Sequence, residues 1–234
     1  MHLLLFDIDG TLVRVNGTGR TAVTDALSSV TGRPISTDGI TFSGRTDPAI
    51  MEAVLEKNGV APTQAVVDEA IAAYVDAMKS TLTAGDVEVL PGVQGLLSAL
   101  DDHPDVHLGL VTGNVEPIAY EKLAVQGLDH YFPVGAFGSD HADRNQLPEL
   151  ATRRAADHTG ESFHSAEHAV VIGDTAHDIE CARAAGARAV AVCTGRYGRS
   201  KLKPHEPDLL LDSLPAVDTF LQQIPGIVAT TDST

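Results

Sequence analysis

The stretch LLLFDIDGT, residues 3–11, decides the fold of this chain. Its four apolar residues predict a short buried strand that stops at two aspartates, Asp7 and Asp9. Side chains alternate along a strand, so we expect both carboxylates on one face at its carboxyl end. In an open α/β sheet, ligands bind at that end. The stretch therefore predicts a ligand site beside the first strand.

The residues that follow the strand favour a site for an anion. Two carboxylates this close repel each other unless a cation or a shared proton lies between them. Gly10 lets the backbone approach a bound group closely, and Thr11 offers a hydroxyl and an N–H group. An ordinary turn is the alternative, because Asp-Gly is a common turn dipeptide. The choice between the two rests on the other strand ends.

Short apolar runs alternate with helical patterns along most of the chain. The runs predict buried parallel strands at 3–6, 106–111, 134–137, 169–172, 189–192 and 209–211. Helical patterns lie between them at 93–100, 116–126, 147–158 and 178–185. This alternation predicts an α/β fold with a doubly wound, Rossmann-like parallel sheet and right-handed crossovers.

One interval, residues 15–86, breaks the alternation. It shows helical patterns at 21–30, 48–57 and 64–82 and no buried strand. At about 70 residues it is far longer than an ordinary strand-to-helix connection. We therefore expect an inserted all-helical cap at 15–86, placed as a lid over a core of residues 1–14 and 87–234. Residues 230–234 read as a loose tail.

Composition limits the partners of the protein. A chain of 234 residues, 43% of them apolar, can bury a large core. Its formal charge of −16 argues against a nucleic acid or an anionic membrane as partner. The excess of 32 acidic over 16 basic residues favours a high-salt habitat, with an acidic mesophile as the alternative.

The sequence also indicates where the protein works. No apolar run approaches the ~20 residues that a membrane span requires, and no basic segment precedes Asp7 as in a secretory signal. Cys181 and Cys193 are the only cysteines, too few for a disulfide framework. We expect free thiols and a cytoplasmic location.

Two further strand ends carry polar groups. The run at 106–111 is followed by Thr112, Gly113 and Asn114 close to a helix start, an arrangement that suits a phosphate. Asn114 as a simple helix cap is the alternative. The run at 169–172 is followed by Asp174 and Asp178.

Asp174 and Asp178 can both face the edge of the sheet as a helix begins, because their spacing is i, i+4. Acidic residues at a helix start also suit the helix dipole, which is the simpler explanation. Together with Asp7 and Asp9 they would place four carboxylates at one edge. Oxygen ligands in this number predict Mg²⁺, which leaves positions for a substrate phosphate.

With these motifs in this order, the chain resembles haloacid dehalogenase superfamily phosphatases of the phosphoglycolate phosphatase-like group, which have a small helical cap. The resemblance covers nearly the whole chain. It rests on DIDGT at 7–11, VTGN at 111–114 and GDTAHD at 173–178. The segments SGRTD at 43–47 and PDLL at 207–210 are similar to that group as well.

The resemblance implies roles for single residues. Asp7 would attack phosphorus and form an aspartyl-phosphate, and Asp9 would be the general acid and then the base. Mg²⁺ would be held by Asp7, the Asp9 carbonyl and Asp174, with Asp178 as ligand or support. Thr112 would donate a hydrogen bond to the phosphoryl group. The neighbouring residues that would bind substrate are Gly10, Thr11, Gly113 and Asn114.

The chain departs from the family pattern at one position. Relatives carry a lysine ahead of the last catalytic strand, but residues 139–148 contain none. Arg144 is the best substitute, since its rigid guanidinium suits phosphate. A solvated surface arginine is the alternative. Lys203 follows Asp174 and so comes in the wrong order.

In the expected cap, Arg45 has two interpretations. It could contact a remote group of the substrate, such as a carboxylate, or it could simply pair with Asp47. The sequence leaves both open.

The function predicted from these residues is an Mg²⁺-dependent phosphomonoester hydrolase acting on a small phosphorylated metabolite, with 2-phosphoglycolate as one candidate. A phosphomutase of the β-phosphoglucomutase kind is the main alternative, because it shares the chemistry of Asp7 and Asp9. A 2-haloacid dehalogenase is disfavoured, since that branch lacks the second aspartate. A non-catalytic phosphate-binding protein would not need Asp9. We expect a monomer or homodimer.

Overall fold

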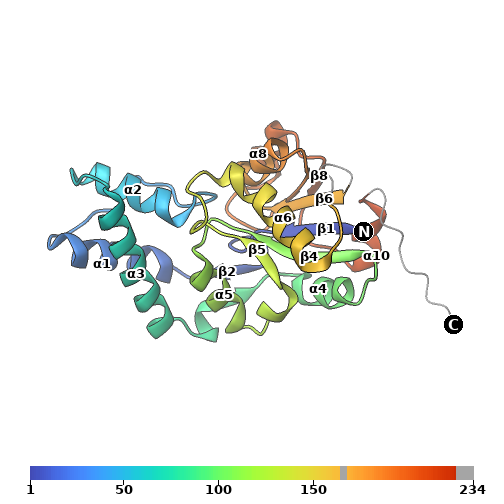
Figure 1. Ribbon diagram of the computed structural model, residues 1–234, viewed down its shortest axis with the longest axis horizontal. Coiled ribbons are helices and arrows are strands. Elements are labelled where there is room, and N and C mark those ends of the chain that lie inside the picture. The colour runs from blue at the N-terminus through green and yellow to red at the C-terminus, as the bar shows by residue number, and fades with distance from the viewer. Residues whose placement is uncertain (164–167, 225–234) are drawn as a thin grey trace.

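A parallel sheet of six strands forms the centre of the computed structural model, which describes residues 1–163 and 168–224 (Figure 1). Its strand order is β5-β4-β1-β6-β7-β8. The strands are β1 (His2–Phe6), β4 (Val106–Val111), β5 (Val134–Ala136), β6 (Ala169–Gly173), β7 (Arg188–Val192) and β8 (Leu209–Leu211). All six predicted strands are present, each within one residue of its expected ends. The predicted parallel α/β fold is confirmed.

Strand β1 lies in the middle of the sheet, hydrogen-bonded to β4 on one side and β6 on the other. Leu4 and Phe6 enter the apolar core on one face, and Leu3 and Leu5 enter the core on the opposite face. A strand buried on both faces reads as an unbroken apolar run, which explains the pattern at residues 3–6.

Helices cover both faces of this sheet. The first core packs α4 (Val93–Asp101), α5 (Glu116–Ala124) and α10 (Val217–Gln222). The second packs α6 (Leu147–Thr159) and α8 (Ala176–Ala184). Short helical segments complete the connections: η1 (Ala84–Asp86), η2 (Asp129–Tyr131), η3 (Arg144–Gln146), α9 (Arg199–Leu202) and η4 (Lys203–His205).

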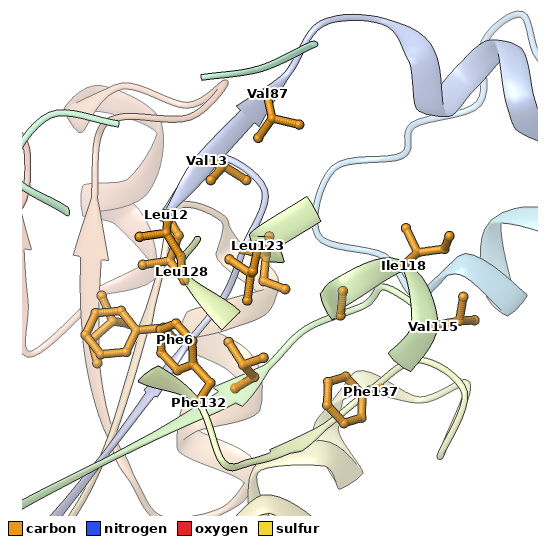
Figure 2. Close-up of a cluster of buried hydrophobic side chains, with 14 of the residues drawn as sticks. Phe6, Leu12, Val13, Val87, Val115, Ile118, Leu123, Leu128, Phe132 and Phe137 are labelled. Atoms are coloured by element: carbon orange, nitrogen blue, oxygen red, sulfur yellow. The ribbon is translucent and has the colours of Figure 1, made fainter. Parts of the chain in front are cut away.

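The first core continues along the sheet towards the insert. Figure 2 shows Phe6 of β1 meeting Phe132 edge-on, with 6.0 Å between the ring centroids. Leu12 and Val13 extend the same cluster beyond the end of β1. This continuity fixes the base of the insert against the sheet, because close-packed side chains resist displacement.

Three helices interrupt the alternation after β1: α1 (Thr18–Thr31), α2 (Asp47–Lys57) and α3 (Gln64–Thr81). They lie together beyond the carboxyl ends of the strands (Figure 1). Residues from all three, among them Leu27, Met51 and Tyr74, are buried in the apolar core. The predicted all-helical insert is confirmed.

A two-stranded antiparallel pair brackets the insert. It consists of β2 (Val13–Val15) and β3 (Val87–Val89), and Val13 pairs with Val89. The sequence did not reveal it, because three residues with one buried side chain each give no periodic signal. The boundaries proposed for the cap, 15 and 86, fall at the end of β2 and just before β3.

Other expectations can be compared with the described residues. Cys181 is buried, Cys193 is half-buried, and both are free. Across residues 1–163 and 168–224, none of the helices combines the length and apolar character needed to cross a membrane. The tail expected at 230–234 lies outside the described residues.

Candidate active site

A cavity of about 270 Å³ lies where the carboxyl ends of the strands face the helical insert. Asp7 and Asp9 after β1, Asn114 after β4 and Asp174 after β6 line one side of it. The insert contributes the residues of the other side: Gly17, Gly19, Arg20, Val23, Phe42, Ser43, Gly44, Arg45, Asp47, Ile50 and Tyr74. Three strand ends singled out in the sequence therefore meet at one cavity.

Three buried carboxylates gather at the inner end of this cavity. Oxygen atoms of Asp7, Asp174 and Asp178 all lie within 4.8 Å of one another. The pKa of Asp7 is raised to about 6, because the effects of burial, Asp178 and Asp9 outweigh the lowering by Arg144. The pKa of Asp174 is raised well above its usual range by burial and then by Asp178 and Asp7.

These carboxylates fit a hard divalent cation. Oδ1 of Asp174 is buried and has no hydrogen-bond partner among the described residues. An unpaired carboxylate oxygen beside two other acids is costly without a cation. The set offers only oxygen atoms, the ligand type that small divalent cations prefer. The side chain of Asp9 does not belong to this group.

Asp178 differs from Asp174 because its oxygens already have partners. It is the third residue of α8, and its Oδ2 accepts hydrogen bonds from the backbone N–H (2.9 Å) and the hydroxyl (2.7 Å) of Thr175. This capping box starts α8 at Ala176, two residues before the start predicted from the helical pattern. Oδ1 of Asp178 forms an ion pair with Arg144. The helix-start interpretation of Asp178 is therefore confirmed, and its role in the site stays a prediction.

Arg144 is buried and lies behind the nucleophile candidate. Its guanidinium is 3.1 Å from Oδ1 of Asp7 and pairs with Asp178 as well. It also donates hydrogen bonds to the carbonyls of Gly44 (3.2 Å) and Val111 (3.3 Å). Burial lowers the pKa of Arg144, but Asp178 and Asp7 raise it more, so the net direction is upward. The alternative of a solvated surface arginine is wrong, because this side chain is enclosed.

Asp9 is held by two donors on a single oxygen. Its Oδ2 accepts from Nδ2 of Asn114 at 2.8 Å and from Nζ of Lys122 at 2.6 Å. Asn114 does not cap the next helix: Val115 occupies the N-cap position of α5. The helix-cap interpretation of Asn114 is therefore wrong, and its amide faces the site instead.

Lys122 is a site residue that the sequence analysis missed. It lies on α5 and is buried, although lysine is among the residues most rarely buried. A signal was available, because Lys122 stands at helical spacing from Ile118 and Ala119, which pack into the core. A lysine on the apolar face of a helix needs a buried anion as partner.

Of the remaining predicted site residues, some line the cavity and others do not. Gly113 lines the cavity, whereas Gly10, Thr11 and Thr112 are not part of its lining. The Thr112 hydroxyl accepts a hydrogen bond from the Asn114 N–H (3.3 Å), and the buried Thr11 hydroxyl has no partner among the described residues. Gly10 has a φ of 88°, and a Cβ there would lie 2.6 Å from Oδ2 of Asp174.

The insert is seated on the sheet edge by the loop before α2. The N–H of Asp47 donates to the carbonyl of Gly113 (2.7 Å), and its carboxylate accepts from the N–H of Val115 (2.9 Å). Thr46 donates to the carbonyl of Ala142 (2.8 Å). The pKa of Asp47 is raised to about 6, because burial, with a smaller effect of Asp9, outweighs the lowering by Lys122 and by the hydrogen bond from Val115.

Arg45 lines the cavity but does not pair with Asp47. Its guanidinium donates to the carbonyl of Ala49 at 2.7 Å. The interpretation of an Arg45–Asp47 pair is therefore wrong, since Asp47 is occupied by Val115. Contact of Arg45 with a remote group of the substrate stays a prediction.

The fold and the site define a class: a Rossmann-like core whose first strand ends in DIDGT, with a helical insert facing that end. A family model described as haloacid dehalogenase-like hydrolase matches residues 4–192, and the chain belongs to this family. This match and the relatives below confirm the predicted enzyme class, a phosphatase of the haloacid dehalogenase type.

Among curated relatives, the chain is similar to a plasmid-encoded phosphoglycolate phosphatase of Cupriavidus necator, with 32% identity over 93% of this chain and 92% of the relative. It is 28% identical to a phosphoglycolate phosphatase of Pectobacterium atrosepticum, over 89% of this chain and 87% of the relative. Among solved structures, a β-phosphoglucomutase of Clostridium difficile has the same fold, with a TM-score of 0.71 at 18% identity over 96% of this chain and 97% of the other.

Proposed function

We propose that this protein hydrolyses phosphate monoesters of small metabolites through an aspartyl-phosphate at Asp7. The observation that carries the proposal is the position of Asp7 at the inner end of the cavity, with Arg144 behind it at 3.1 Å and Asp9 lining the same cavity. The relative from Cupriavidus necator supports 2-phosphoglycolate as a substrate to be tried first.

A divalent cation, Mg²⁺, would be held by the carboxylates of Asp7 and Asp174 and by the carbonyl of Asp9. When bound, it would offset the negative charge of the phosphate and of the surrounding acids. Asp178 would support the site rather than bind directly, because both of its oxygens already accept hydrogen bonds from Thr175 and Arg144.

In the first half of the reaction, a carboxylate oxygen of Asp7 forms a bond to phosphorus while the ester P–O bond breaks. Asp9 gives its proton to the departing ester oxygen, which leaves as an alcohol. In the second half, Asp9 takes a proton from water and the water oxygen bonds to phosphorus. The bond between phosphorus and the Asp7 oxygen breaks, which frees inorganic phosphate and restores the Asp7 carboxylate. The guanidinium of Arg144 and a hydrogen bond donated by Thr112 would stabilise the charge on the phosphoryl oxygens.

A panel of phosphate esters tests this function. Purified protein with Mg²⁺ is incubated with 2-phosphoglycolate, other small carboxylated esters and sugar phosphates, and released phosphate is measured. We expect turnover of at least one ester, and loss of that turnover in Asp7→Asn with an unchanged melting temperature. Retention of more than a few per cent of the rate in Asp7→Asn would overturn the assignment of the nucleophile.

The same assay separates the alternatives. A β-phosphoglucomutase activity would convert a sugar 1-phosphate to its 6-phosphate with little free phosphate, and no turnover of any ester would favour a phosphate-binding protein. The cytoplasmic location and the choice between monomer and homodimer stay predictions from the sequence.

A further inference from the structure

Lys122 carries a buried charge beside the catalytic cavity. It is 5% exposed, and its ammonium lies 2.6 Å from Oδ2 of Asp9. Asn114 donates to the same oxygen at 2.8 Å. In the described residues, the other oxygen of Asp9, Oδ1, accepts no hydrogen bond, and the Asp9 side chain is 41% exposed. One oxygen of this carboxylate is therefore fixed and the other is left for a ligand.

The second anion near Lys122 comes from the insert. Asp47 is buried, and the positive charge of Lys122 lowers its pKa against the effect of burial. The backbone and the carboxylate of Asp47 are bound to Gly113 and Val115, on the loop that leads into α5. Lys122 thus interacts with an acid from each side of the cavity, Asp9 from the core and Asp47 from the insert.

We propose that Lys122 is a positioning residue for Asp9: with Asn114 it holds Oδ2, so that Oδ1 carries the proton to and from the reacting oxygen. This inference rests on the proposed function. A carboxylate on a loop after a strand samples several rotamers, and a general acid acts only within hydrogen-bond reach of the leaving oxygen. Two donors on one oxygen restrict that motion, and the charged one makes the stronger bond.

A purely structural role for Lys122 is the competing explanation. A lysine that only balances the buried acids would affect stability and would affect all substrates alike. A residue that acts through Asp9 should matter most where the leaving oxygen needs a proton. This difference can be measured with two esters of unlike leaving groups.

The test compares an alkyl phosphate with p-nitrophenyl phosphate, whose leaving group departs without protonation. For Lys122→Met we expect kcat/KM, which reports formation of the aspartyl-phosphate, to fall about 10–100-fold on the alkyl ester and only a few-fold on p-nitrophenyl phosphate. The later hydrolysis step is common to both esters and does not enter kcat/KM. Asn114→Ala should show the same pattern more weakly, and Lys122→Arg should recover part of the loss. Lys79→Met is the matched control, because Lys79 is an exposed lysine of the insert helix α3.

Coupling to Asp9 is tested by a double variant. Asp9→Asn with Lys122→Met should lose little more than Asp9→Asn alone, since both changes remove one function. Equal losses of kcat/KM on the two esters, or additive losses in the double variant, would overturn the proposal. A rise in KM without a fall in kcat would also overturn it, because Lys122 would then bind the substrate.

A crystal structure of Lys122→Met gives a readout that does not depend on activity. We expect the Asp9 carboxylate to leave the position that it has in the wild type. If Asp9 does not move in Lys122→Met, the inference is wrong even if the wild-type enzyme is active. If Asp9 moves but the wild-type protein hydrolyses no phosphate ester, only the proposed function is wrong. If Lys122→Met does not fold, Asn114→Ala and Lys122→Arg carry the same comparison of the two esters.

Discussion

Arg144 and Asp178 form a buried ion pair behind Asp7, and Arg144 contacts Asp7 as well. Removing one member of such a pair leaves an uncompensated charge in a low-dielectric site, at a cost of about 3–5 kcal/mol. The same pairing keeps Arg144 within 3.1 Å of Asp7. The contacts that hold the site together are therefore also those that place a cation against the nucleophile candidate.

The first prediction concerns this cation. Arg144→Ala should lower turnover at least tenfold, because the phosphate and several carboxylates lose their fixed positive charge. Arg144→Lys should restore part of the rate, since it returns the charge without the planar guanidinium. Steady-state kinetics on the best ester of the panel measures both.

Two exposed cations are the controls for Arg144. Arg153→Ala and Lys203→Ala should keep the wild-type rate, as both side chains lie at the surface. If Arg144→Ala is fully active and one of these two is not, Arg144 is not the substitute for the family lysine.

A second prediction separates Asp174 from Asp178. Oδ1 of Asp174 is unpartnered, whereas both oxygens of Asp178 are bound by Thr175 and Arg144. Asp174→Ala should therefore raise the Mg²⁺ concentration needed for half-maximal activity more than Asp178→Ala does. Asp178→Ala should cost more stability, because it breaks the capping box and the ion pair. Metal titrations and thermal unfolding of both variants measure this, and the opposite ranking would exchange their roles.

At the scale of elements, Thr46 and Asp47 at the start of α2 form hydrogen bonds that hold the insert against the sheet edge. Asp47 is the acidic residue among these contacts. Lys122, the N–H of Val115, Asp9 and the buried ring of Tyr74 surround it. At neutral pH its carboxylate is ionised, although burial opposes the ionised form.

A pH prediction follows from Asp47. Its pKa in the folded protein, about 6, lies above its ordinary value of 3.8. The folded state therefore holds the proton more tightly, so the contribution of this group to stability is full below about pH 4 and is lost as the pH rises through about 6. The difference corresponds to about 3 kcal/mol of unfolding free energy.

Asp47→Asn removes this titration while its amide oxygen can still accept from Val115. Denaturant unfolding of both proteins at several pH values between about 4 and 7 should show the variant gaining stability relative to the wild type as the pH rises. A difference that does not change with pH would mean that Asp47 is not held with a raised pKa.

The elements that could be predicted are those whose burial is uniform. The inner strands of the sheet are covered on both faces and the half-buried edge strand β8 is all leucine, so each reads as an apolar run, while β2 and β3 are too short to leave a pattern. In the site, Asp7 and Asp174 stand directly after strands and were visible for that reason. Lys122 was not, because it lies inside a helix and its partner Asp9 is 113 positions away. Only the packing of α5 brings them together.

At the scale of the whole molecule, the charge distribution is uneven. The chain has a formal charge of −16, yet Arg20, Arg45, Lys122 and Arg144 all line the cavity. A phosphate ester approaching this protein meets an overall repulsive field, and inside the cavity these four cations face an equal number of carboxylates, Asp7, Asp9, Asp47 and Asp174. The inner acids oppose binding unless a cation is present.

The metal prediction follows from those acids. Without divalent cations the protein should be inactive, and Mg²⁺ should restore activity. Mg²⁺ should also raise the melting temperature, since a ligand at a hundredfold excess over its Kd stabilises the folded state by about 2.7 kcal/mol. Differential scanning fluorimetry with chelator and then with Mg²⁺ measures this, and Asp174→Ala should shift much less. Full activity in excess chelator would contradict the assignment.

The way in which the insert is hydrogen-bonded to the sheet edge has an evolutionary consequence. The contact between Asp47 and Gly113 is made by main-chain atoms, and a Cβ at Gly113 would lie 2.2 Å from the carbonyl of Arg45. Main-chain contacts survive the exchange of neighbouring side chains. Cavity-lining side chains of the insert that lie outside the apolar core, such as Ser43 and Arg45, can therefore be replaced without disturbing how the insert rests on the sheet. Single substitutions at such positions can therefore change which esters fit the cavity, while Asp7, Asp9 and Asp174 beneath it keep their positions.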